Sequence, residues 1–339
     1  MHSWIIVDQE LALFHDKAPN FNTNELTAAL PDQEALWQAS SADSWANVYN
    51  RTNAANSETP PSLNDLFKRL MSRELVNDPR GVTKLQLRLL LHPIQALVHH
   101  LHQCIGCFAG EPSSPQAPSF VKQMLEVQAI LGDWYNLYCR CVQKEGQACP
   151  VLLTNLMMYS LICLNTMTYF PDIESFARGE LGQEQFVATG WARTEQLGSA
   201  RRIWFHCGQV MRLVRSIPEV HRPIWMPAAV YRVCLLLWST SMANNNPLQP
   251  AGPFNNSVFP IDDMLPENDA VQRFLLMQQG TPILSLKKGV FYSITSPAET
   301  IAYCLEVMKE EEFNTNFAMG IRNRLEILSH RVKVISPIL

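Results

Sequence analysis

The segment Val151–Phe170, VLLTNLMMYSLICLNTMTYF, most constrains the fold, because it lies in a stretch without charged residues from Gly146 to Pro171. A helix of this length could cross a lipid bilayer. Six of its twenty residues, however, are Thr, Ser or Asn: Thr154, Asn155, Ser160, Asn165, Thr166 and Thr168. So many polar groups fit the centre of a protein core better than lipid. The sequence therefore predicts a helical core built around this segment, and no membrane span.

Helix signals dominate the rest of the chain. Trp4, Val7, Leu11 and Phe14 repeat at helical spacing over residues 2–15. Ser62 followed by Asp65 resembles a capping box at the start of another helix. Glycine is sparse, with 14 residues in 339, which favours helices over strands. Further helical runs are predicted over residues 83–108, 119–144, 183–217, 228–242, 297–312 and 314–333.

These patterns predict an all-α fold in which residues 1–339 form one large multi-helix domain. An irregular loop is expected over 244–266, and at most a short β-hairpin near 281–294, turning at Lys288 and Gly289. The hydrophobic fraction is 47% and the charged fraction is 17%, below the globular average of about 25%, which indicates a thickly packed interior. The nine cysteines follow no framework spacing and are expected to be reduced.

Charge is unevenly distributed, although the net charge of −4 gives no sign of nucleic-acid binding. Residues 1–80 hold six Lys or Arg and eleven Asp or Glu, whereas residues 191–232 hold seven arginines and only two glutamates. One interpretation is charge complementarity within the fold, together with solvated faces. The other is a surface for an anion or a partner.

The stretch VHHLHQCIGC (Val98–Cys107) is the only concentration of metal-ligand residue types, and its spacing argues against a zinc site. On a helix, His100, Cys104 and Cys107 share a stripe while His99 and His102 point elsewhere. His100 and Cys107 would then lie about 10 Å apart along the axis, too far for zinc bonds of about 2.0–2.3 Å. No metal or cofactor is expected in this chain.

Enzyme motifs are scarce, since GxSxG, GxGxxG, GxxxxGK[ST] and HExxH are all absent. Asp262 and Asp263, followed by Glu267, are faintly similar to the acidic metal clusters of helical terpene cyclases. They lie beside Pro260 and Pro266 without a second acidic cluster. Solvation of a loop, or capping of a helix near residue 267, is therefore the favoured interpretation. The chain is not expected to be an enzyme.

The most ordered pattern is SARRIWFHCGQVMRLVRSIP (Ser199–Pro218), in which apolar residues cover one side of a helix. Arg201, Arg212 and Arg215 lie on the other side with Gly208. These arginines form either a solvated face or a surface that docks an acidic partner, an anionic ligand or another helix. In the second case Gly208 would permit a close approach.

A ligand pocket is predicted between the charge-free helix and the helix of Val230–Met242. Its candidate lining is Tyr159, Met167, Tyr231 and Trp238. The alternative for these four side chains is plain core packing.

Several stretches together resemble one known family. They are MHSWIIVDQELALFHDKAP, KLQLRLLLHPIQALVHHLHQC, ARRIWFHCGQVMRLVRSIP with RPIWMPAAVYRVCLLLWSTSM, and ILSLKKGVFYSITSPAETIAYCLEVM with GIRNRLEIL. In this order they resemble the fungal-specific transcription factor regulatory domain, or middle homology region. The resemblance is closest to the subgroup that follows paired two-Cys two-His zinc fingers.

The resemblance implies an all-helical regulatory domain that acts in the nucleus on RNA polymerase II genes, often those of metabolism or secondary-metabolite clusters. It implies transcriptional co-regulators or self-association as partners, with a small-molecule effector also considered. DNA binding and zinc would belong to a finger module absent here, so the chain is expected to be an N-terminally truncated gene product, an excised domain or a descendant that lost its DNA reader. The alternatives are a helical interaction scaffold without regulatory activity and, less favoured, a helical enzyme with an unrecognised site.

Overall fold

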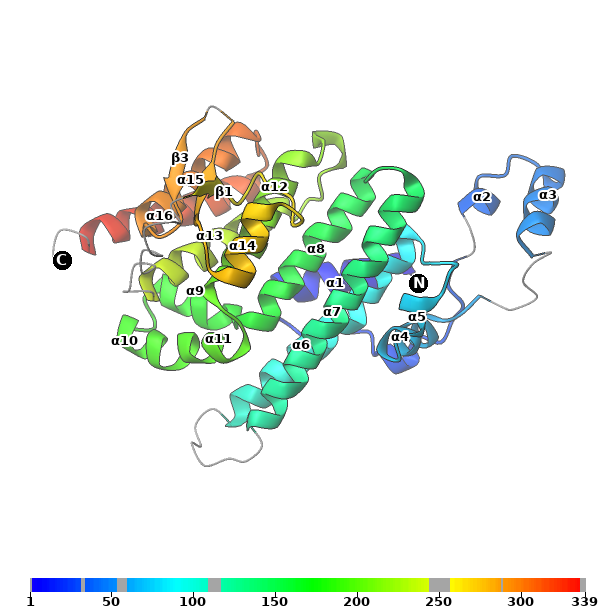
Figure 1. Cartoon of the computed structure of the whole chain (residues 1–339), viewed down its shortest axis with the longest axis horizontal. Coiled ribbons are helices and arrows are strands. Elements are labelled where there is room, and N and C mark those ends of the chain that lie inside the picture. The colour runs from blue at the N-terminus through cyan, green and yellow to red at the C-terminus, as the bar shows by residue number, and fades with distance from the viewer. Residues whose placement is uncertain are drawn as a thin grey trace.

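The computed structural model describes residues 2–31, 34–53, 60–108, 117–243, 257–287 and 289–335, and it is predominantly helical (Figure 1). The all-α prediction is confirmed. The helices are α1 (His2–Phe14), α2 (Glu34–Trp37), α3 (Ala42–Asn53), α4 (Leu63–Met71), α5 (Glu74–Asn77), α6 (Lys84–Phe108), α7 (Ala117–Glu145), α8 (Pro150–Met167), α9 (Phe170–Arg178), α10 (Gln183–Phe186), α11 (Ala192–Leu197), α12 (Ala200–Ser216), α13 (Met226–Ala243), α14 (Asp269–Met277), α15 (Pro297–Glu310) and α16 (Asn316–Ile335). Short 3₁₀ turns occur at Thr23–Glu25 and Glu219–His221, and a π-helical turn occurs at Val187–Trp191.

Helix α8 is the charge-free segment, and it lies in the core against α6, α7 and α12. By length and composition alone it could span a membrane, but 67% of its 18-residue window is buried inside the fold. Its polar side chains have partners there. The Asn155 amide nitrogen donates to the Lys84 carbonyl oxygen at 3.0 Å, and the Thr166 hydroxyl donates to the Cys163 carbonyl oxygen at 2.7 Å. These bonds make a polar helix tolerable in an apolar interior.

Helices α6 and α7 lie side by side as a long antiparallel pair across the middle of the molecule (Figure 1). Pro93 lies within α6 without ending it. The buried Trp134 of α7 joins the two helices, because its indole N–H donates to the Leu87 carbonyl oxygen at 2.9 Å. Helix α4 packs against this pair and begins at Ser62, which forms with Asp65 the capping box that the sequence predicts.

The C-terminal half packs α12 and α13 against each other and α13 against α15 and α16. A small sheet lies beside them with strand order β1, β2, β3, formed by Val258–Pro260, Thr281–Ser285 and Phe291–Ser293. Strands β2 and β3 pair antiparallel, which confirms the predicted hairpin near 281–294. Lys288, one of the two predicted turn residues, lies outside the described residues, and Gly289 has φ of +73°.

Strand β1 pairs with β2 in parallel, and the sequence analysis missed it. It falls within 244–266, where an irregular loop is predicted, although residues 244–256 of that range lie outside the described residues. The reason for the miss is that its hydrogen-bonding partner is more than twenty residues away. A three-residue strand carries too little alternation to be recognised locally.

Candidate functional site

Helix α1 turns three apolar side chains toward solvent and buries two polar ones among apolar neighbours. Trp4 is 67% exposed and Leu11 is 53% exposed, with Val7 exposed between them. Asp8 and Gln9, in contrast, are buried. An apolar stripe at helical spacing ordinarily packs against the core. The spacing therefore predicts the helix correctly, but the side chains that face the core are Ile5, Ala12 and Leu13 together with Asp8 and Gln9, rather than Trp4, Val7 and Leu11.

The buried carboxylate of Asp8 joins α1 to α6 and to the segment after α1. It accepts hydrogen bonds from the backbone N–H groups of Asn20 at 2.9 Å and Phe21 at 3.2 Å, and from the His92 ring at 3.0 Å. Burial raises the pKa of Asp8, but these hydrogen bonds outweigh it and the net pKa is lowered. Burial lowers the pKa of His92, against the opposing effect of Asp8. Asp8 is therefore an ionised acceptor beside a largely neutral imidazole.

Gln9 forms the second half of this α1 cluster. The Arg88 guanidinium donates to the Gln9 side-chain oxygen and, at 2.9 Å, to Glu10. The Gln95 amide nitrogen donates to the Gln9 carbonyl oxygen at 3.2 Å. Among the described residues, Gln9 Nε2, His92 Nδ1 and Gln95 Oε1 are buried without a hydrogen-bond partner. Such atoms usually mark a place for water or a ligand.

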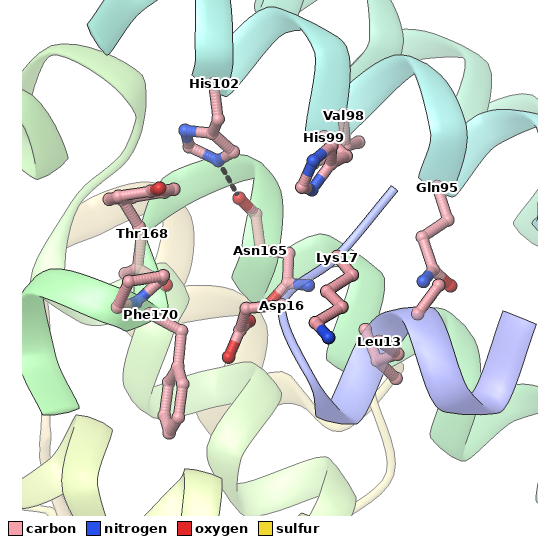
Figure 2. A pocket seen from close by; sticks show the side chains of 13 residues that line it. Leu13, Asp16, Lys17, Gln95, Val98, His99, His102, Asn165, Thr168 and Phe170 are labelled. Atoms are coloured by element: carbon pink, nitrogen blue, oxygen red, sulfur yellow. Dashed lines mark hydrogen bonds between the residues drawn. The ribbon is translucent and has the colours of Figure 1, made fainter. Parts of the chain in front are cut away.

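A cavity of about 30 Å³ lies beside this cluster, between α1, α6, the end of α8 and the start of α9 (Figure 2). That volume holds one or two water molecules or a functional group of a few atoms. Its lining includes eight residues with polar side chains: Asp16, Lys17, Gln95, His99, His102, Asn165, Thr168 and Tyr169.

Arg232 of α13 fixes Asp16, one of the residues that line the cavity. Its guanidinium donates to the Asp16 carboxylate at 2.7 Å and to the Leu13 carbonyl oxygen at 2.5 Å, and it lies 4.0 Å from the centre of the Phe170 ring. Arg232 is only 4% exposed on its side chain. The charge of Asp16 is therefore neutralised inside the protein.

Lys17 and His99 also line the cavity. In the described part of the chain, no hydrogen bond or ion pair is formed by either side chain, and Figure 2 shows both among the residues that line the cavity. Burial lowers the pKa of His99, whereas Asp16 raises it. His102 is engaged, because its ring Nε2 donates to the Asn165 carbonyl oxygen at 2.5 Å. Sequence reasoning missed this cavity because its walls come from four separate elements.

The three predicted surface arginines do not act as one set. Arg201 and Arg215 are fourteen residues apart on α12, which corresponds to about 21 Å along the axis. Arg201 is half-buried, and Arg212 donates from Nε to Gln209 within the same helix at 3.0 Å. Arg215 is 11% exposed and pairs with the fully buried Asp262 at 2.8 Å. Assigning Arg215 to an open partner surface is therefore wrong, because Asp262 neutralises its charge inside the fold.

Asp262 is the centre of a second buried polar cluster. Besides Arg215, its carboxylate accepts from the Ser285 backbone N–H at 3.0 Å and from the Tyr303 hydroxyl at 2.6 Å. The interpretation of Asp262 as a solvated or helix-capping residue is wrong, because its side chain is inaccessible and its partners hold it inside. A sequence signal was missing, since the three partners lie 23 to 47 residues away.

The sequence suggests that Gly208 permits a close approach. The segment that approaches it in the structure is residue Ile261 of the same chain. A Cβ atom added there would lie 2.7 Å from the Ile261 carbonyl oxygen, a separation that real structures avoid. The segment that carries Asp262 therefore approaches α12 over a residue without a side chain.

The predicted pocket residues lie in separate surroundings. Tyr159 stacks on Trp134 and Tyr135, with ring centres 5.1 and 5.6 Å apart. Met167 is fully buried and packs against Gly198, where an added Cβ would lie 2.8 Å from its sulfur. These contacts are those of core side chains.

The other two pocket candidates face α9. The Tyr231 hydroxyl donates to Glu174 at 3.4 Å, and the Trp238 ring stacks on Phe176 at 4.8 Å. Helix α12 packs against both α8 and α13. The helix α12 therefore lies between the two helices chosen for the pocket, and the contacts of these four side chains agree with the core packing that was the alternative.

Within the described residues, no group of three or more His, Cys, Asp or Glu side chains is arranged to hold a metal ion. In the histidine-rich stretch, Cys104 lies 3.7 Å from His100, one helical turn away. His102 instead bonds to α8. All nine cysteines are free thiols.

Comparison with known proteins relates almost the whole chain to part of longer fungal proteins. A transcription factor of Zymoseptoria tritici is 35% identical, and the alignment covers 97% of this chain and 37% of that protein. Transcription factor 1 of Elsinoe fawcettii is also 35% identical over 97% of this chain and 35% of its own length. The chain is related to a region of fungal transcription factors.

A further relative, transcription factor opdJ of Penicillium oxalicum, is 27% identical over 97% of this chain and 44% of its own length. The chain thus spans less than half the length of these relatives. No family model matches it. No solved structure matches it either.

Proposed function

We propose that this chain is the regulatory region of a fungal transcription factor and controls RNA polymerase II genes in the nucleus. The observation that carries the proposal is 35% identity, along 97% of the chain, to proteins named as transcription factors. The helical fold agrees with the middle homology region that the sequence resembles. Genes of metabolism or of secondary-metabolite clusters are the proposed targets.

In this proposal DNA is contacted through a zinc-finger module outside residues 1–339, and zinc belongs to that module. The chain itself carries the contacts that adjust activity. Its partners would be transcriptional co-regulators or a second copy, and a small molecule would act as an effector.

The outward face of α1 supports protein contacts. Trp4, Val7 and Leu11 leave a continuous apolar stripe in solvent, and exposed apolar patches commonly mark interaction surfaces. Helix α1 is held in place from its opposite side by Ile5, Asp8 and the other buried residues, so its attachment to the fold does not depend on burying the stripe.

A reporter assay tests this function. Residues 1–339 are fused to a heterologous DNA-binding module in a fungal host, and transcription is compared on several carbon and nitrogen sources. Activation or repression that depends on the fused chain supports the proposal. A fusion that is expressed, folded and nuclear yet leaves transcription unchanged under every condition supports the alternative of a helical scaffold.

A matched pair of variants asks whether the α1 face is used. Trp4→Ala with Leu11→Ala removes the apolar stripe, whereas Val220→Ala removes an exposed apolar side chain elsewhere. Loss of regulation in the first variant alone assigns the contact to α1. Equal regulation in both variants places it elsewhere.

A further inference from the structure

We propose that two copies of this chain associate by packing helix α3 of each copy on the exposed apolar stripe of α1 of the other. As a contact of a regulatory region, this interface rests on the proposed function and names a second copy as the partner. Association itself requires only the folded chain, so it can be measured without transcription.

Helix α3 lies outside the core and keeps its apolar face exposed. Between residues 42 and 51 no side chain is buried, and Trp45 is 44% exposed and Tyr49 40% exposed. The two rings stack on each other with centres 4.9 Å apart. Helix α3 packs against the short helix α2, and Figure 1 shows both helices set apart from the rest of the fold. A helix of 12 residues is only marginally stable without tertiary packing, so a further contact on this face would stabilise it.

The chain leaves the body of the molecule before α2 and returns to it after α3 at one place. Ala29 forms an antiparallel bridge with Ser62, and the Leu30 backbone N–H donates to the Pro61 carbonyl oxygen at 3.0 Å. Helices α2 and α3 are therefore carried on a base that is fixed from both sides.

The exposed stripe of α1 has a spacing that α3 can match. Trp4, Val7 and Leu11 are separated by three and four residues, and Trp45 and Tyr49 by four. Side chains at these spacings form a ridge along one face of a helix, and such ridges pack into the grooves of a second helix. Within one chain the two faces do not cover each other, because α1 packs against α6 in the middle of the molecule and α3 lies at its edge (Figure 1).

A second copy covers both faces at once. In a two-fold dimer the contact of α3 with α1 occurs twice, so the assembly closes and no apolar face is left to recruit a third chain. An aromatic side chain offers about 150–250 Å². At their exposed fractions, the five side chains of the two faces present roughly 400–500 Å² in each copy. The total approaches the area of about 1,000 Å² that a specific interface needs, which indicates a weak dimer.

Charges favour an antiparallel arrangement of α3 on α1. Asp43 lies in the first turn of α3 and Arg51 in its last turn, whereas Lys17 follows the end of α1. All three side chains are exposed. Antiparallel packing brings Asp43 beside Lys17 of the other copy. Parallel packing would bring Arg51 beside Lys17, and these like charges would repel.

Sedimentation velocity of the purified chain between about 1 and 300 μM tests the association. We expect a monomer–dimer equilibrium with a dissociation constant of about 10 μM, as a small interface allows. A monomer at every concentration refutes the proposal. Assemblies larger than a dimer refute the closed arrangement.

Alanine variants locate the interface. Trp4→Ala and Trp45→Ala should each weaken the dimer at least about tenfold, because each removes the largest side chain of one face. Phe317→Ala removes a 52% exposed aromatic side chain from α16 and should leave the dissociation constant unchanged. Equal weakening in all three variants shows nonspecific association and rejects the assigned faces.

Mixing the two tryptophan variants tests which face meets which. A mixed dimer of Trp4→Ala with Trp45→Ala keeps one intact contact between α3 and α1, whereas both contacts are damaged in either variant alone. The mixture should therefore associate about tenfold more tightly than either variant by itself. Association no tighter than that of the separate variants refutes the packing of α3 on α1.

A charge exchange tests the orientation and leaves both tryptophans in place, so it also applies if Trp45→Ala loses helix by circular dichroism. Asp43→Lys and Lys17→Glu should each weaken the dimer, and the double variant should recover the original dissociation constant. Absence of recovery rejects the antiparallel arrangement. Dimerisation with a silent reporter fusion would reject the regulatory function while keeping the interface, and an active fusion of a strictly monomeric chain would do the reverse.

Discussion

The two buried polar clusters differ in how completely their groups are satisfied. Around Asp262, both carboxylate oxygens are bonded, and Arg215, Ser285 and Tyr303 supply the donors. Beneath α1, Asp8 is equally well bonded, but neighbouring Gln95 keeps a buried atom without a partner. A complete cluster acts as a clamp between distant segments. In the incomplete cluster, buried nitrogen and oxygen atoms keep hydrogen-bonding capacity that the fold leaves unused.

Removing the acid of the complete cluster should give the largest effect. Asp262→Asn leaves Arg215 nearly buried without its counter-charge, and breaking such a pair typically costs about 3–5 kcal/mol. Urea unfolding followed by circular dichroism measures the change. The neighbouring Asp263 is exposed, so Asp263→Asn should stay within about 0.5 kcal/mol of the unmodified chain. Similar losses in both variants would show that the cluster is not a clamp.

The close approach that positions Asp262 can be broken without touching charge. Gly208→Ala places a Cβ 2.7 Å from the Ile261 carbonyl oxygen, and the forced shift should cost about 1–3 kcal/mol in unfolding free energy. Gly132→Ala on α7 meets nothing within 4 Å and should stabilise by about 0.5–1 kcal/mol through helix propensity. Equal changes in thermal unfolding temperature would contradict the close contact.

Acid should weaken the α1 cluster through His92. Burial lowers the pKa of His92 below its ordinary 6.5, so the unfolded chain binds the proton more readily than the folded chain. Its contribution to stability therefore falls as pH drops below about 6.5 toward the lowered pKa. Intrinsic amide exchange is base-catalysed and slows from pH 7 to pH 5, so the expected effect is a lower protection factor for the α1 amides at pH 5 than at pH 7.

His92→Gln supplies the comparison for this measurement. The variant lacks the titrating ring and should lose less stability between pH 7 and pH 5 than the unmodified chain. His206, whose pKa burial lowers to about 3, titrates in the same direction and remains in both proteins. The difference between the two proteins therefore isolates His92, and an identical pH dependence would exclude it.

The smallest effect is expected on the outward face of α1. Trp4→Ala should change the unfolding free energy by no more than about 0.5 kcal/mol, because two thirds of the side chain is exposed. Ile5→Ala, one residue along, removes a fully buried side chain and should cost about 2–5 kcal/mol. Urea unfolding of both variants measures the contrast. A large loss for Trp4 would mean that the stripe packs within the fold.

Local chemistry made several elements readable from the sequence. The capping box of Ser62 and Asp65 forms as predicted, because both partners lie within one helical turn. The hairpin of β2 and β3 forms for the same reason, since its strands adjoin one turn. The charge-free segment could be assigned to the core because it is long enough to cross a bilayer but carries too many polar side chains to lie in lipid.

Contacts between distant segments could not be read in this way. Arg215 carries no mark that its partner is Asp262, and the spacing of Trp4, Val7 and Leu11 is the same for a buried stripe and an exposed one. The cavity lies where the ends of α1 and α8 meet α6 and α9, and Tyr159 and Trp238 are separated by another helix.

The sequence by itself determined that this chain folds into helices around an uncharged central segment, because helix periodicity, capping and charge depletion act over a few neighbouring residues. Only the tertiary structure decided which face of α1 is buried, which arginines are neutralised and where a cavity remains. Those outcomes depend on the relative positions of elements that lie tens to hundreds of residues apart, and such positions follow from packing of the whole core.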